Sequence, residues 1–376
     1  MARLEVAPVG GRGDREAFIS LPYRLHRSDP AWVAPLRRDV RAALCRESNP
    51  FFDHAEAEYF LARRDGVGVG RIAAIHNRLH NEFHRDAVGF FGFFEAEDDA
   101  EAAAALFDAS SSWLRARGLT MMRGPASFST NDECGLLVDG FDAPPTLMMP
   151  HNPPRYVGLV EGAGFIKAKD LLVYQTTVEP PPARLVAGAE RLERRCGVTT
   201  RPLAMSRFAA EVDLVKRLYN ASWERNWGFV PMTGREIEHL ARQLEPVVVP
   251  ELVAFAESGG QPIGFAAAVP DLNVALRRNP SGRIFPGLGF IKVLWAARRV
   301  DRLRVLLLGT LPEWRGKGVD ALLCRRIWEA GSRKGYRWAE AGWVLEDNHP
   351  MRNGLSRMGF VAYKTYRMYD RQIAKA

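Results

Sequence analysis

The chain has 376 residues, of which 47% are hydrophobic and 26% charged, as in folded globular proteins. Its formal net charge of +8 suits an anionic partner such as nucleic acid, a membrane surface or an anionic cofactor. The sequence contains no apolar run of the roughly 20 residues that a membrane-spanning helix needs. It also lacks a tail-like block of lysine and arginine and an apolar core of signal-peptide length near its start. We therefore expect a cytoplasmic protein of two domains that does not bind DNA.

The first half of the chain predicts strands and helices in a definite order. Residues 4–9 form a strand, 14–26 and 35–45 helices, 58–64 and 67–75 a hairpin, 88–94 a strand, 98–117 a helix and 119–123 a strand. A long polar segment follows, from Gly124 to about Pro150, which is typical of a functional loop or of packing between domains. Asn152 then precedes a short helix, and Gly164-Phe165 opens a strand that ends near residue 175.

A proline-rich segment, Glu179-Pro180-Pro181-Pro182-Ala183, divides the chain near its middle. Three consecutive prolines can continue neither a helix nor a central strand, and they favour an extended linker. We predict one domain at residues 1–178, a proline-rich linker and helix at 179–196, and a second domain at 197–376.

The second half repeats the order of the first. It predicts a strand at 198–203, helices at 208–227 and 233–244, a hairpin at 252–257 and 263–269, a strand at 304–311, a helix ending near 334, a strand at 336–345, a helix at 351–358 and a strand at 360–369. Thr233, with Glu236 three residues later, forms a capping box that starts the second helix. The shared order favours an internal duplication.

The glycine-rich turn that runs from Leu311 to Val319 carries the main functional signal. It lies between a strand and a helix, where backbone N–H groups and the helix dipole suit an anion such as a pyrophosphate. Gly316 and Gly318 allow the backbone to approach a ligand closely, and Arg315 and Lys317 add positive charge for phosphate oxygens.

The spacing Arg315-x-x-Gly318 resembles the acyl-CoA-binding turn of the GCN5-related N-acetyltransferase (GNAT) superfamily. There, Gln or Arg is followed after two residues by Gly, and after one more residue by Gly or Ala. In this sequence the last position is Asp320. A carboxylate there repels a pyrophosphate unless it turns away to cap the helix, and we expect the cap. The downstream order of Asn348, a helix and Gly359-Phe360 is also similar to the family.

This resemblance implies an α/β (α+β) fold of two GNAT-like domains, each a mixed, mostly antiparallel twisted sheet flanked by helices. It also implies a binding site for acetyl-CoA or another acyl-CoA, made by Leu311, Arg315, Gly316, Lys317, Gly318 and Val319. In the family a strand opens beside the turn and exposes backbone N–H groups, and Leu311 occupies that place.

The resemblance also suggests which residues carry the chemistry. The amine must lose a proton and the leaving thiolate must gain one. We take Glu346 as the base, ahead of Asp347 and Glu340, with Asn348 beside it at the end of its strand. A solvent-exposed carboxylate near a turn is the alternative for Glu346.

Family members protonate the thiolate with a tyrosine on the fourth helix, at the position of Leu355 in this sequence. Tyr363, Tyr366 and Tyr369 follow on the last strand and could substitute, and Tyr366 is our candidate. Ordinary half-buried strand aromatics are the alternative for all three.

The first copy lacks the anion turn. Five carboxylates, at positions 95, 97, 98, 99 and 101, surround the start of its helix. They suit the helix dipole but repel a pyrophosphate. We therefore expect a degenerate N-terminal copy.

We expect no metal site. His76, His80 and His84 stand four residues apart, but a polar connection rather than a long helix is predicted there, and an acceptor-site or interdomain loop fits better. The four cysteines have neither metal-ligand nor redox spacing.

An insertion at residues 271–301 contains an apolar core and is followed by arginines. A basic amphipathic segment, here 285–304, can lie on an anionic membrane or form a lid over an acceptor groove, and both remain open.

The predicted function is that of an acyl-CoA-dependent N-acyltransferase, in the first place an N-acetyltransferase, that moves an acyl group from CoA to a small-molecule or peptide amine by direct attack. A non-catalytic acyl-CoA-binding regulator stays open, because Asp320 and Leu355 depart from the family pattern. So does an aminoacyl transferase resembling the Fem enzymes, which pair two GNAT folds and use aminoacyl-tRNA. The glycine-rich turn argues against the latter, and RNA is therefore not expected. The acceptor, the acyl length and the oligomeric state are not predicted.

Overall fold

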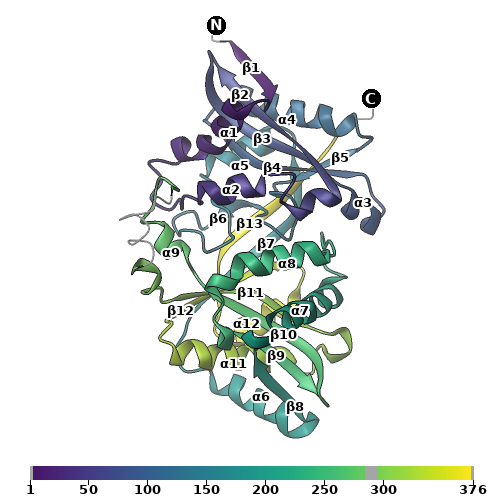
Figure 1. Ribbon diagram of the computed structural model, residues 1–376, viewed down its shortest axis with the longest axis vertical. Coiled ribbons are helices and arrows are strands. Elements are labelled where there is room, and N and C mark those ends of the chain that lie inside the picture. The colour runs from purple at the N-terminus through teal and green to yellow at the C-terminus, as the bar shows by residue number, and fades with distance from the viewer. Residues whose placement is uncertain (1–2, 284–294, 374–376) are drawn as a thin grey trace. The chain divides into compact units, whose positions relative to one another are not determined.

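The computed structural model describes residues 3–283 and 295–373 (Figure 1). The chain divides into two compact units that are not simple halves of the sequence. Among the described residues, unit 1 consists of residues 3–171, 275–283 and 364–373, and unit 2 consists of residues 172–274 and 295–363.

Unit 1 is built on a mixed sheet with the order β1-β2-β3-β4-β5-β13. Its strands are β1 (Leu4–Pro8), β2 (Ala55–Arg64), β3 (Val67–Asn77), β4 (Val88–Ala96), β5 (Met121–Gly124) and the end of β13 (Val361–Gln372). A short strand, β6 (Leu136–Asp139), also pairs with β13. Only β4 and β5 run parallel, whereas the other ladders are antiparallel.

Helices cover both faces of this sheet. On one face, α4 (Ala100–Arg115) and α5 (Arg155–Gly162) bury Leu106, Phe107 and Val160 in a core that includes Phe60 of β2. On the other face, α1 (Arg12–Leu25) places Phe18 against Tyr59, with ring centroids 5.3 Å apart. Adjacent strand residues point to opposite faces, which is why Tyr59 and Phe60 serve different cores.

Unit 2 contains the part of the sheet with the strand order β7-β12-β11-β10-β9-β8. Its strands are the end of β7 (Ile166–Thr177), β12 (Trp338–Leu345), β11 (Arg302–Thr310), β10 (Gln261–Pro270), β9 (Val253–Ser258) and β8 (Val198–Pro202). β11 and β12 run parallel, and the ladders from β8 to β11 are antiparallel.

The same alternation builds two cores in unit 2. Ala254 and Ala256 of β9 face α6 (Ala183–Cys196) and α11 (Val319–Arg333), which lie side by side (Figure 1). Val253 and Phe255 face α7 (Phe208–Trp223) instead.

The remaining helices are shorter or lie at the edges of the two units. They are α2 (Arg37–Ala43), α3 (Arg78–His84), α8 (Gly234–Leu244), α9 (Asn273–Leu276) and α12 (His349–Arg357), with 3-10 helices at Pro50–Asp53, Met205–Arg207, Glu245–Val247, Pro250–Leu252 and Pro312–Trp314.

The units exchange their last strands. β13 comes from the end of the chain, yet its residues from 364 onward lie in unit 1, where Tyr369 and Ile373 are fully buried in the core. Likewise, β7 begins in unit 1 and its residues from 172 onward lie in unit 2. The predicted domains, 1–178 and 197–376, are continuous segments of the chain, whereas each compact unit contains residues from both segments. The predicted boundaries therefore remain a prediction about the internal duplication.

The structure confirms the predicted fold class, with mixed, mostly antiparallel sheets flanked by helices in the expected order. It adds α3, α9 and β6, which the sequence did not predict. In the part of the chain that is described, no helix combines the length and apolar character needed to span a membrane.

Candidate active site

Two parallel strands of unit 2 separate beside the glycine-rich turn. The ladder between β11 and β12 runs only from Arg302–Trp338 to Val305–Ala341. Beyond it, β11 continues to Thr310 in register with β10. The two strands therefore form a fork that opens toward the turn.

The turn itself has a left-handed backbone at two positions and open space above both. Gly316 has φ 71° and Gly318 has φ 96°, a left-handed backbone that favours glycine. A Cβ built on either residue would meet no atom within 4 Å. Gly318 is the N-cap of α11, and no side chain caps the first N–H groups of that helix. Helical N–H groups of this kind have no partner within the helix and bind anions readily.

The two cations of the turn are placed differently. Arg315 donates from Nη2 to the carbonyl oxygen of Ser222, 2.8 Å away at the end of α7. Lys317 is exposed, and its Nζ lies 4.7 Å from the centre of the Trp314 ring. Arg315 therefore ties the turn to α7, while Lys317 presents its charge at the surface.

Leu311 and Val319 flank the turn. The N–H of Leu311 donates to the carbonyl of Ile263, 2.9 Å away, because the ladder with β10 extends one residue past the end of β11. This donor is thus already bonded, unlike the exposed N–H that the resemblance implies. Val319 is fully buried in the core between α11 and the sheet.

Asp320 does not cap α11, contrary to our expectation. The N-cap is Gly318 and no side-chain cap is present. Asp320 lies in the first helical turn, one turn before Cys324, whose thiol pKa is raised to about 12 by burial and by the Asp320 charge. Leu355, at the family's tyrosine position, is buried in the core beneath α12.

Glu346 and Asn348 lie together where β12 ends and α12 begins. The side-chain oxygen of Asn348 accepts from Met351 N–H at 3.2 Å and so caps α12. Arg352 Nη1 donates to the backbone carbonyl of Glu346 at 2.5 Å. The connection that carries the half-buried Glu346 is therefore fixed by the start of α12.

The tyrosines of the last strand are divided between the units. Tyr366 and Tyr369 lie in unit 1 and are fully buried, with hydroxyls that donate to Pro150 O and Glu161 at 3.0 Å each. Tyr363 lies in unit 2 and is half-buried. The structure thus places Tyr366 in a different unit from Glu346 and Asn348.

A buried ion pair lies at the root of the fork. Arg304 and Glu340 face each other one pair before the ladder ends, with Arg304 Nη1 2.6 Å from Glu340 Oε1 and side chains only 5% and 0% exposed. Tyr363 donates its hydroxyl to the other oxygen of Glu340. For the group of Arg304, Glu340 and Tyr363, the sequence offered one signal, which is a charged residue within an apolar strand. From this signal we named only Glu340, as a possible base.

The corresponding fork in unit 1 is filled by its own chain. The β4–β5 ladder stops at Phe90–Arg123, and Ala126 N–H then donates to Phe91 O at 2.8 Å. A Cβ on Gly92 would lie 2.2 Å from Ala126 O, so the two backbones are in contact.

The acidic start of α4 is used within unit 1. Asp99 caps the helix by accepting from Ala102 N–H at 3.0 Å. Arg64 pairs with Asp99 and Glu101 at 2.7 and 2.8 Å. The contrast between the two forks agrees with a degenerate first copy.

The three spaced histidines do not form a metal cluster. His76 belongs to β3, and His80 and His84 belong to α3. His80 is buried, and burial lowers its pKa to about 3. Within residues 3–283 and 295–373, no group of three or more His, Cys, Asp or Glu side chains could hold a metal ion.

Much of the predicted membrane or lid segment, residues 284–294, lies outside the described residues. Of the residues that follow, Arg299 stacks on the exposed Trp295 at 3.7 Å and Arg302 stacks on Trp338 at 5.0 Å. Arg304 is buried against Glu340 and presents no charge to a surface.

Comparison with solved structures supports the fold. A tandem GNAT protein from the clavulanic acid biosynthesis pathway matches with a TM-score of 0.59 at 14% identity, covering 100% of both chains. A GNAT protein from Sphaerobacter thermophilus matches with a TM-score of 0.54 at 13% identity, covering 98% of this chain and 96% of that one. These likenesses show that the chain has the tandem GNAT fold.

No family model matches the sequence. Two related sequences match along almost their whole lengths. The bacterial ceramide synthase of Caulobacter vibrioides is 36% identical over 99% of this chain and 98% of its own length. Protein YghO of Escherichia coli is 35% identical over 96% of this chain and 94% of its own length. The chain therefore belongs to the family of this bacterial ceramide synthase and YghO, built on two GNAT units.

Proposed function

We propose that this protein is an N-acyltransferase that moves an acyl group from an acyl thioester to the amine of a long-chain amino alcohol, giving a ceramide-type amide. The observation that carries the proposal is the open, uncapped glycine turn at the start of α11 beside the fork of unit 2. The name of the Caulobacter relative supports this acceptor. Since ceramides are amides of fatty acids, it also favours a long acyl chain over acetyl.

The residues present fit the phosphate part of acyl-CoA. The turn offers backbone N–H groups at a helix N-terminus, open space above Gly316 and Gly318, and the exposed charge of Lys317. Asp320 opposes this, because its carboxylate lies in the same first turn. The bound thioester supplies the activated acyl carbon.

The reaction needs one proton removed and one supplied. The amine nitrogen forms a bond to the acyl carbon while the carbon–sulfur bond breaks, and the thiolate takes up a proton. We propose Glu346 as the group that accepts the amine proton, with Asn348 and Arg352 holding its connection in place.

For the proton that the thiolate gains, Tyr363 is preferred to Tyr366. Tyr366 is fully buried in unit 1 with its hydroxyl on a carbonyl, whereas Tyr363 is half-buried in unit 2 and is oriented by Glu340. The Tyr363 hydroxyl points its single hydrogen at Glu340, so protonation of the thiolate requires the hydroxyl to turn from Glu340 towards the sulfur.

The test uses the full-length protein with acyl-CoA esters from acetyl to palmitoyl and a long-chain amino diol as acceptor. Amide product is measured by liquid chromatography with mass spectrometry, and released thiol is measured by colour. We expect amide and thiol in equal amounts, with the longer thioesters preferred. Tight thioester binding without either product would instead identify a non-catalytic binder, and amide formed only from aminoacyl-tRNA would identify a Fem-like transferase.

A further inference from the structure

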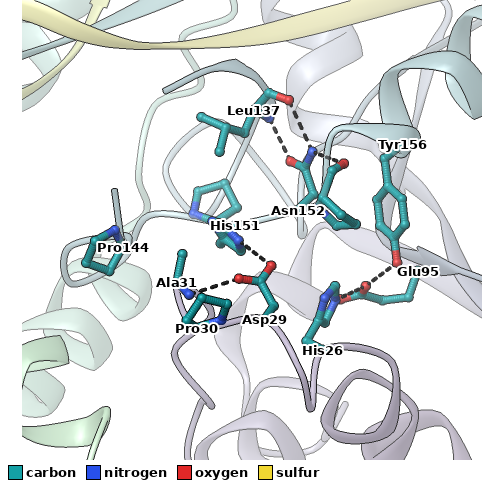
Figure 2. A network of polar contacts seen from close by, with 12 residues as sticks. His26, Asp29, Pro30, Ala31, Glu95, Leu137, Pro144, His151, Asn152 and Tyr156 are labelled. Atoms are coloured by element: carbon teal, nitrogen blue, oxygen red, sulfur yellow. Dashed lines mark hydrogen bonds and ion pairs between the residues drawn. The ribbon is translucent and has the colours of Figure 1, made fainter. Parts of the chain in front are cut away.

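Unit 1 contains buried and half-buried polar side chains around the connection between α1 and α2 (Figure 2). They form two pairs, His26 with Glu95 and His151 with Asp29. Ionisable groups inside a core are costly unless they are fully bonded, so each pair needs a separate account of its hydrogen bonds.

The His26–Glu95 pair is closed. Glu95 Oε2 lies 2.6 Å from His26 Nε2 and accepts from the Tyr156 hydroxyl at 2.8 Å. Arg71 lies 3.7 Å from the other carboxylate oxygen. Burial raises the pKa of Glu95, but these neighbours outweigh burial and hold the pKa below its ordinary value. This carboxylate is surrounded by its own partners.

The His151–Asp29 pair is different. His151 is only 3% exposed, and its Nε2 lies 2.9 Å from Asp29 Oδ2. Burial raises the pKa of Asp29, but the hydrogen bonds from His151 and Ala31 outweigh burial, and the pKa lies below its ordinary value. Asp29 is therefore ionised at neutral pH and can only accept hydrogen bonds. Nε2 of His151 must therefore carry the hydrogen. Burial also lowers the pKa of His151, so the ring is neutral and Nδ1 keeps a lone pair.

Nδ1 of His151 is buried and has no hydrogen-bond partner among the described residues. Of the residues labelled in Figure 2, Pro30 and Pro144 have no N–H, and Ala31 N–H is bonded to Asp29 at 2.9 Å. The side-chain amide of Asn152 is likewise committed to Leu137 and Pro153. A buried acceptor that is fixed in one tautomer and left without a donor calls for a partner that the chain itself does not supply.

We propose that unit 1 binds a long-chain primary amine whose nitrogen donates a hydrogen bond to Nδ1 of His151, with Asp29 holding the ring in the tautomer that accepts it. The choice of an amine rests on the proposed function, in which an amine is the acceptor. The titratable groups near the ring are Asp29, His26 and Lys364, of which Lys364 donates to Pro144 O at 2.8 Å. Unit 1 thus has a ligand of its own, although its fork is filled.

The first test measures binding of dodecylamine and of dodecanol to the full-length protein by calorimetry, with no thioester present. In His151→Gln the amide can still donate to Asp29, but the ring acceptor is lost. We expect at least tenfold weaker amine binding in this variant. His76→Gln is the matched control, because His76 also lies in unit 1 with an unpartnered, buried Nδ1, and it should leave the affinity unchanged. Equal affinity of wild type and His151→Gln overturns the proposal, and so does dodecanol binding as tightly as the amine.

The second test reads the tautomer directly from the nitrogen chemical shifts of His151. Wild type should carry its hydrogen on Nε2. In Asp29→Asn, the side-chain oxygen keeps the bond from Ala31 N–H, so the amide N–H₂ faces the ring and the hydrogen should move to Nδ1. That variant should then lose amine binding about as much as His151→Gln. A hydrogen on Nδ1 in the wild type, or full amine affinity in Asp29→Asn, contradicts the proposal.

These outcomes are separable from those of the acyl-transfer assay. A protein that binds the amine through His151 but forms no amide overturns only the proposed function. A protein that forms the amide while His151→Gln leaves amine affinity unchanged overturns only the assignment of His151.

Discussion

Gly318 and Gly335 stand at opposite ends of α11 and share a backbone that disfavours other residues. Their φ angles are 96° and 86°, and a Cβ on either would meet no atom within 4 Å. Replacing either with glutamate should cost a similar amount, about 1–2 kcal/mol of stability. Only Gly318 belongs to the proposed phosphate site. Comparing the two glutamate variants therefore separates the effect of backbone strain from the effect on ligand binding.

We expect Gly318→Glu to weaken CoA binding by about tenfold or more, since like charges near a protein surface repel by roughly 1–4 kcal/mol at 4 Å. Gly335→Glu should leave the affinity unchanged. Calorimetric titration of both variants with CoA checks this. Equal affinities would mean that the turn is only structural.

The buried pair Arg304–Glu340 predicts a large stability effect from a single residue. Arg304→Met leaves a fully buried carboxylate without its cation, which should destabilise the protein by about 3–5 kcal/mol. Arg38–Asp39 is the exposed comparison, with side chains 71% and 61% exposed, and Arg38→Met should change stability by no more than about 0.5 kcal/mol. Urea unfolding measures both. Similar effects of the two substitutions would contradict the assignment of a buried, coupled pair.

Cys324 and Cys196 should differ in reactivity. Burial and the nearby Asp320 raise the pKa of Cys324 to about 12, whereas Cys196 is exposed. The thiolate is the reactive form, so iodoacetamide at pH 8 should label Cys196 well before Cys324. Peptide mass spectrometry over time follows both sites. Equal labelling rates in the folded protein would rule out a half-buried, protonated Cys324.

At the scale of single elements, the start of α4 shows how the first copy uses its acidic residues. Burial raises the pKa of Asp99, but the hydrogen bonds from Ala102 N–H and Arg64 outweigh this and lower it. A lowered folded-state pKa stabilises the protein above the ordinary Asp value of about 3.9, and this contribution is lost as the pH falls through the folded-state pKa.

Asp99→Ala should therefore cost about 1 kcal/mol of unfolding free energy at pH 7 through the lost cap. The difference from wild type should shrink as the pH falls below about 4. Asp98→Ala removes the same charge from an exposed neighbour and should cost much less. Urea unfolding at pH 7 and pH 3.5 tests both variants. A pH-independent cost for Asp99→Ala would exclude the ionised cap.

Local signals explain which elements the sequence could predict. The capping box at Thr233 and Glu236 is present at the start of α8, and Asn348 starts α12, because these caps depend on residues only three positions apart. The short strand β6 was missed, because its four residues pair with β13, which is distant in sequence. The cap that we expected from Asp320 was wrong because a glycine two residues earlier begins the helix.

At the scale of the whole chain, the order of elements and the glycine turn could be predicted, but the exchange of strands could not. An apolar alternation shows that β13 is a strand but does not name its partner. The candidate site was predicted where backbone geometry defines it, at Gly316 and Gly318. It was missed where distant segments meet, as in the Arg304–Glu340–Tyr363 group and the His151–Asp29 pair.

The exchange of strands predicts how fragments of this protein behave. Residues 1–178 lack the end of β13, which pairs with β5 and places Tyr369 and Ile373 in the core of unit 1. Losing two buried apolar side chains removes about 1.5–3 kcal/mol each, and the edge of β5 becomes exposed as well. This loss is comparable to the whole stability of many domains, about 5–15 kcal/mol. We expect the fragment alone to be unfolded or aggregated, with poorly dispersed amide resonances.

Adding a peptide of residues 361–376 should restore a dispersed spectrum, because it supplies the missing strand and core residues. A peptide carrying Tyr369→Asp and Ile373→Asp is the control, since it keeps the backbone but cannot enter an apolar core. A fragment that folds without either peptide would show that unit 1 does not depend on β13. In that case, the exchange of strands would join the two copies without contributing to the stability of each copy.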